Sequence, residues 1–173
     1  MKKSVLFIFS LGLINGLCSV QAFSSQSINR PVIKAWDFIR FADSVFTYSF
    51  SKNDRVIGTF HSRNLKKKKN WRRLGSDKIF NQVMVDKKAM MSLINISNWK
   101  VDNKTFKKKR GYYRLFMAGS YFDKDKKQTF FREVHLYYPK KVQQILVISP
   151  EKKFFKKQEF KDFIKGVQSF LKK

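Results

Sequence analysis

The clearest hydrophobic pattern in the chain lies near its C-terminus. Between residues 156 and 172 the apolar side chains recur mostly at spacings of three and four, which places them on one side of a helix. The apolar positions are Phe160, Phe163, Ile164, Val167, Phe170 and Leu171. The pattern predicts an amphipathic helix from Lys156 to Lys172. Its apolar stripe needs a partner surface, and the face of a sheet is the natural one.

From Trp99 onward, ahead of this helix, the pattern has a period of two. The segments 111–122, 129–138 and 141–149 each predict a strand, and the charged turn and the Pro-Lys pair between them indicate chain reversals. Because the turns are short, these consecutive strands must be antiparallel.

The first part of the chain after residue 34 is dense in aromatic and β-branched residues. The segment 35–50 and the segment 56–60, separated by a polar turn, predict strands joined by a hairpin. A short helix from Pro31 to Ala42 is an alternative that the period leaves open. Farther along, apolar residues at spacings of three and four predict one internal amphipathic helix from Ser76 to about Ile96.

These elements together predict an α+β fold in which an antiparallel sheet is packed by a long internal helix and a C-terminal amphipathic helix. We expect two layers. The stretch from Gly111 to Lys173 resembles the end of Mog1/PsbP-like domains, through Gly119–Asp123, Phe131–Tyr137, Leu146–Pro150 and the terminal helix. The resemblance implies an α/β/α sandwich on an antiparallel sheet. It also implies a non-enzymatic binding or assembly module without specifying a partner.

The N-terminus has the layout of a secretory signal. Lys2 and Lys3 precede an uncharged apolar stretch, and Val20 and Ala22 supply the small residues that precede a cleavage site. We expect a cleavable signal peptide at 1–22, export to the periplasm or the medium, and no stable transmembrane span. A flexible lead-in at 23–34 and a single α+β domain at 35–173 complete the predicted organisation.

Cys18 is the only cysteine of the chain and lies inside this predicted signal. Leu17 precedes it, where signals for lipid attachment favour a small residue, so we interpret Cys18 as an apolar residue of the discarded segment. The mature chain then has no cysteine, which excludes disulfides, thiolate metal sites and cysteine nucleophiles.

The charge of the chain is its strongest compositional feature. The formal net charge is +26, of which Lys2 and Lys3 supply only two, and such an excess attracts polyanions. Cations alternate with aromatic rings in two clusters, the first of which is a basic loop or a helix start. We take both as candidate contacts with an anionic surface: Lys66, Lys67, Lys68, Lys69, Trp71, Arg72 and Arg73, and Lys107, Lys108, Lys109 and Arg110 before two tyrosines.

Candidate chemistry is sparse. Glu133 and His135 alternate on one predicted strand and share a face, which we expect to be exposed, with Glu133 paired to one of the many lysines. Asp123 and Asp125 resemble the start of a calcium loop, but a hairpin turn explains them fully. We therefore predict no catalytic centre, no metal and no cofactor.

The sequence favours an exported, strongly basic, non-enzymatic binding or accessory protein of the cell envelope. Its partner would be an anionic envelope component or an acidic membrane surface. A secreted nucleic-acid-binding protein using the same clusters is the main alternative, and an enzyme centred on Glu133 and His135 is a minor one. A protein partner, with the charge reflecting a general excess of lysine, also remains open.

Overall fold

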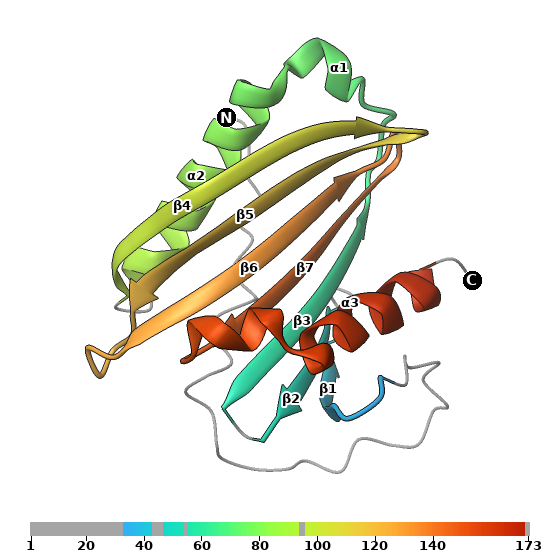
Figure 1. Cartoon of the computed structure of the whole chain (residues 1–173). Helices are drawn as coiled ribbons and strands as arrows, with labels where there is room; N and C mark the ends of the chain where they lie inside the picture. Colours follow the sequence, from blue (N-terminus) through green and yellow to red (C-terminus); the bar gives the residue numbers. More distant parts are fainter. Residues whose placement is uncertain (1–32, 43–46, 54, 94–95, 172–173) are drawn as a thin grey trace.

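The fold is built on one seven-stranded antiparallel sheet (Figure 1). The computed structural model describes residues 33–42, 47–53, 55–93 and 96–171, so the predicted signal peptide and the lead-in up to residue 32 lie outside the described residues. The strand order is β1-β2-β3-β7-β6-β5-β4. The strands are β1 (Asp37–Ala42), β2 (Thr47–Lys52), β3 (Val56–Asn64), β4 (Ser97–Lys109), β5 (Tyr112–Phe122), β6 (Gln128–Tyr137) and β7 (Lys141–Ser149).

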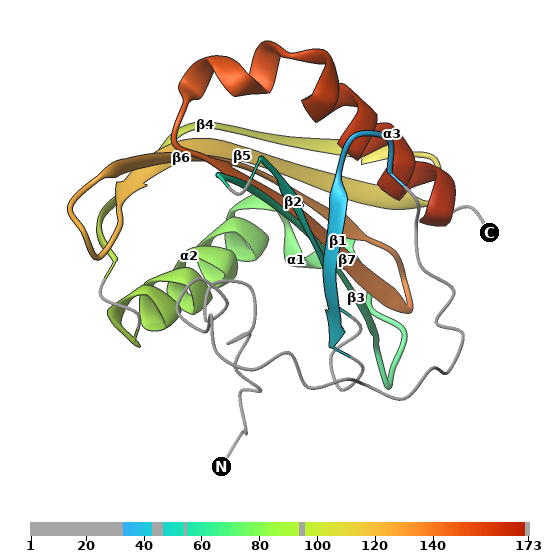
Figure 2. The same cartoon turned by 90° about the horizontal axis from the view of Figure 1, so that it is seen from below.

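Helices cover both faces of this sheet. Helices α1 (Trp71–Leu74) and α2 (Ser76–Leu93) lie on one face, and the 3-10 helix η2 (Lys152–Lys156) and helix α3 (Gln158–Leu171) lie on the other (Figure 2). The α+β prediction is confirmed, but the expectation of two layers is wrong. The central strand β7 is buried at every position from Val142 to Ser149, so both of its faces need a cover.

The core under α3 is rich in aromatic rings. Phe163 and Val167 of this helix are fully buried, and the Phe163 ring lies 4.4 Å from the Trp36 ring and 5.7 Å from the Phe50 ring, measured between centroids. Gly58 on β3 makes room for it, because a Cβ added there would lie 2.5 Å from the Phe163 ring. The predicted packing of the C-terminal helix on the sheet is confirmed.

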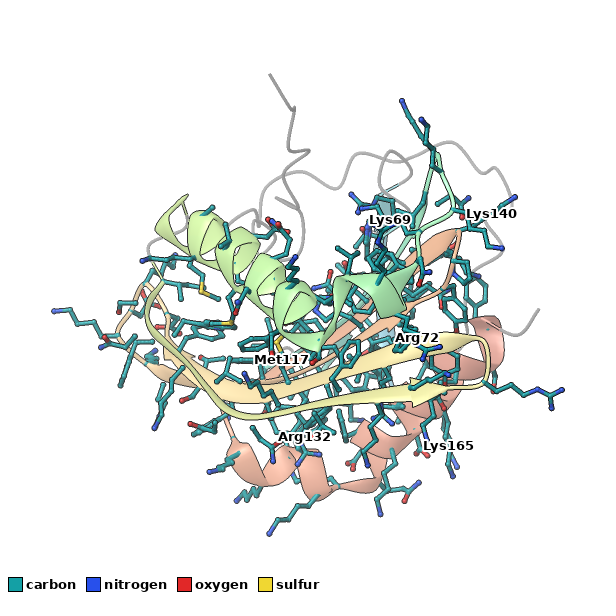
Figure 3. The ribbon with its side chains drawn as sticks, turned by 90° about the horizontal axis from the view of Figure 1, so that it is seen from above. Lys69, Arg72, Met117, Arg132, Lys140 and Lys165 are labelled. Atoms are coloured by element: carbon teal, nitrogen blue, oxygen red, sulfur yellow. The ribbon has the colours of Figure 1, made fainter. Side chains whose placement is uncertain are left out.

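The core under α2 lies on the opposite face. Ile79 and Val83 of the helix belong to one buried cluster with Leu115 and Met117 of β5 and Leu146 of β7. Figure 3 shows Met117 between α2 and the sheet. The internal helix is thus observed as predicted, although its described extent ends at Leu93.

The prediction of strands in the first part of the chain is confirmed, and the helical alternative for Pro31–Ala42 is wrong over 37–42. Phe38 pairs with Phe50 across β1 and β2, and their rings pack at 5.6 Å, which holds this segment extended. Ile33, within the predicted lead-in, is buried in the core under α3.

Candidate functional site

The two basic clusters meet at one end of the sheet. Lys68, Lys69 and Trp71 from the first cluster and Lys108 and Lys109 from the second line one groove of about 440 Å³. Other walls of the groove are formed by Tyr112, Tyr113 and Pro139. We call this region, comprising residues 66–73, 107–113 and 138–141, the basic end. The sequence placed the clusters some forty positions apart, and the fold brings them together.

Strand register explains this convergence. Tyr113 of β5 pairs with Tyr137 of β6, so the tip of the β4–β5 hairpin lies beside the β6–β7 turn. Backbone hydrogen bonds fix the first cluster to that turn: the Leu65 N–H donates to the Lys140 carbonyl at 2.7 Å, and the Lys69 N–H donates to the Pro139 carbonyl at 2.8 Å. Figure 1 shows α1, the hairpin tip and the turn at the same end.

The cationic side chains of both clusters are exposed, whereas Trp71 is buried. The Trp71 indole N–H donates to the Tyr138 carbonyl at 2.7 Å, and its ring packs at 4.9 Å from Tyr137. Trp71, which we took as a candidate surface contact, is therefore part of the core. This ring holds α1 on the sheet, and it is not free to stack on a ligand at the surface.

Sequence reasoning missed the contribution of the β6–β7 turn to the basic end. Lys140 is exposed, and Lys141 places its ammonium 5.3 Å from the centre of the Tyr138 ring. Figure 3 shows Lys69 and Lys140 at the same end of the molecule. The turn carries no basic cluster of its own in the sequence, because only Lys140 and Lys141 stand directly after Pro139 before an apolar segment begins.

A second polar site lies beneath α2. The Glu133 carboxylate is buried, and its Oε1 lies 3.0 Å from the Lys87 ammonium and 2.8 Å from the His135 Nε2. The Gln144 side-chain amide also donates to Oε1. The predicted pairing of Glu133 with a lysine is confirmed. The expectation that this face of β6 is exposed is wrong, because α2 covers it.

The charges around Glu133 keep its carboxyl ionised. Burial alone would raise its pKa, but Lys87 and His135 outweigh burial and lower the pKa of Glu133 to about 2. Burial, with Glu133 and Asp86 nearby, raises the pKa of the Tyr137 phenol well above its ordinary range. Glu133 is therefore a fixed negative charge, and Tyr137 remains a neutral hydroxyl.

This buried carboxylate makes stability depend on pH in a definite direction. The pKa of Glu133 is lowered in the folded protein from an ordinary 4.5 to about 2. The contribution of this shift to the free energy of unfolding is therefore complete above pH 4.5 and is lost as the pH falls toward 2. We expect the free energy of unfolding to decrease more steeply across this window in the wild type than in a Lys87→Met/Glu133→Met double variant. Urea unfolding at several pH values measures both slopes, and parallel slopes would contradict the assignment.

The acidic turn between β5 and β6 is explained by its own hydrogen bonds. Asp123 Oδ1 accepts from the backbone N–H groups of Asp125 and Lys127, each at 2.9 Å. This geometry confirms the hairpin-turn interpretation of the aspartates.

Comparisons with known proteins assign no relative. No protein-family model matches the chain. The curated proteins give no significant match either. Within the part of the chain that the structure describes, no helix has both the length and the apolar character needed to cross a membrane.

Proposed function

We propose that the protein is an exported, non-enzymatic binding module that contacts an anionic surface of the cell envelope through its basic end. The observation that carries this proposal is the convergence of both basic clusters around one groove. Side chains that share one end of a molecule can contact one surface at the same time, whereas dispersed lysines cannot. The Mog1/PsbP-like resemblance is part of the same proposal, and helices on both faces of an antiparallel sheet support it.

The physical basis is electrostatic attraction. Each Lys or Arg near an anionic lipid surface contributes about 1 kcal/mol, and this contribution decreases within a Debye length of the surface. The exposed cations of the basic end are Lys66, Lys67, Lys68, Lys69, Arg72, Arg73, Lys107, Lys108, Lys109, Arg110 and Lys140. The half-buried Tyr112 and Tyr138, whose rings pack at 5.1 Å, add amphipathic side chains of the kind that favour headgroup layers.

A matched pair of triple variants tests the position of the contact. We expect Lys107→Gln/Lys108→Gln/Lys109→Gln to weaken binding to acidic vesicles by at least about tenfold, since three contributing charges are lost. Lys124→Gln/Lys126→Gln/Lys127→Gln removes the same charge from exposed positions at the opposite end of β5 and should change binding by less than about twofold. Co-sedimentation with phosphatidylglycerol vesicles across a salt series measures the affinity.

Two outcomes of this experiment would count against the proposal. Equal losses in the two triple variants would mean that net charge, and not the basic end, drives binding. Binding to single-stranded DNA with a steep salt dependence, in the absence of vesicle binding, would favour the nucleic-acid alternative. We do not propose an enzyme, because Glu133 is committed to Lys87, His135 and Gln144 beneath a helix.

A further inference from the structure

A separate cavity lies between the α1–α2 segment and the sheet. Its volume is about 520 Å³, which is within the range of small-molecule sites in proteins. The walls come from β3, β6, β7 and the two helices. Lys69, Trp71 and Tyr137 line both this cavity and the groove of the basic end, so the two spaces are neighbours.

The inner wall of the cavity holds buried polar side chains. His135 and Tyr137 are 7% and 5% exposed, and their rings stack at 5.9 Å with an angle of 7° between planes. Arg63, on β3, lines the same cavity as His135 and Tyr137. His135 Nε2 lies 2.8 Å from the Glu133 carboxylate, so His135 is held by Glu133 and forms part of the fixed inner wall.

The charge of the lining is positive. Arg63, Lys69, Lys78 and Lys87 line the cavity, and among the described residues Asp86 is the one carboxylate in its wall. Glu133 lies behind the wall, where it contacts Lys87 and His135, and its single charge offsets one of the positive charges of the lining. The excess of positive charge in a partly enclosed space favours an anion over a neutral or cationic ligand.

The cavity also has apolar lining, part of which is exposed beside polar residues such as Lys78 and Gln82. Leu74 and Val85 line it and are 39% and 63% exposed, which makes them two of the most exposed large hydrophobic side chains in the described residues. Ile79, Val83 and Val142 continue this apolar surface inward. Apolar side chains at a cavity mouth with polar groups inside suit a ligand that has a charged head and an apolar body.

We propose that this cavity binds a small organic anion with an apolar body, such as a medium-chain carboxylate. Arg63 and Tyr137 hold the head group, and Leu74 and Val85 contact the body. This site is distinct from the surface contact proposed for the basic end, and it does not depend on that function.

Calorimetric titration of the purified protein with decanoate tests the proposal. We expect saturable binding of one decanoate per chain, and binding of decanol, which has the same body without the charge, weaker by about tenfold or more. Arg63→Gln should weaken decanoate binding by about tenfold. Lys88→Gln changes the charge equally at an exposed position on α2 outside the cavity wall and should leave the affinity unchanged.

A second variant keeps the test independent of any loss of fold. Val85 is largely exposed, so Val85→Glu should fold normally while placing a carboxylate at the mouth, and it should weaken decanoate binding. The Lys107→Gln/Lys108→Gln/Lys109→Gln variant should bind decanoate as the wild type does, so failure at one site is distinguishable from failure at the other. Equal affinity for decanoate and decanol, absence of saturation, or equal losses in Arg63→Gln and Lys88→Gln would overturn the proposal.

Discussion

Replacing Lys87 with methionine is expected to lower the free energy of unfolding by about 3 to 5 kcal/mol. The substitution keeps a long side chain but removes the ammonium that lies 3.0 Å from the Glu133 carboxylate. Glu133 is 1% exposed, so the remaining charge would be buried without its main counter-charge. Equilibrium unfolding in urea, followed by circular dichroism, measures the effect.

Two further variants separate the ion pair from other causes. Lys88→Met makes the same substitution at the next position, which is exposed, and should change the free energy of unfolding by less than about 0.5 kcal/mol. Adding Glu133→Met to Lys87→Met removes the unpaired charge and should restore at least half of the lost stability. If the double variant is no more stable than Lys87→Met alone, the loss arises from packing and not from charge.

Replacing Phe163 with alanine is the second large effect that we expect, with a loss of about 3 to 5 kcal/mol in the free energy of unfolding. The Phe163 ring is fully buried between α3 and the sheet and packs against Trp36 and Phe50. The surrounding rings would relax only partly into the space that it leaves. Phe170→Ala, at a partly exposed position on the same helix, should cost less in the same urea titration.

Gly58 provides the control for this packing. Gly58→Ala adds a Cβ at 2.5 Å from the Phe163 ring and should destabilise the wild type by about 1 to 3 kcal/mol. In the Phe163→Ala background that penalty should largely disappear, since the added methyl group would then occupy vacated space. A double-mutant cycle measures the coupling, and additive losses would show that the two positions do not meet in this way.

Much of the sheet and both long helices could be predicted from the sequence, because the buried positions of each strand or helix recur at the period typical of that structure. Phe163 and Val167 illustrate this for α3, and the alternating burial of β5 illustrates it for a strand whose buried side chains face the core under α2. Strand β4 was missed. Most of its side chains are exposed, and at its end Lys107, Lys108 and Lys109 give no apolar alternation, so a long edge strand looks like a charged loop.

The candidate sites were predictable only in part. The cations of the basic end could be found as clusters, but their meeting depends on the Tyr113–Tyr137 register, which no local pattern encodes. The burial of Glu133 and His135 was missed for a related reason. The polar alternation in β6 is that of a solvated face, and Lys87 is indistinguishable in the sequence from its exposed neighbour Lys88. Burial of this face depends on a helix more than forty residues earlier in the chain.

The position of β4 at the margin of the sheet has a consequence for self-association. An edge strand of 13 residues has unpaired backbone groups that a second copy could extend into a continuous sheet. Pairing would bring Lys100, Lys104 and Lys107–Lys109 close to the lysines of that copy, which repels it. The irregular register on either side of Lys100 and Val101 also interrupts the flat ladder that such pairing needs. The charge of this strand thus protects the protein from aggregation, whatever the protein binds.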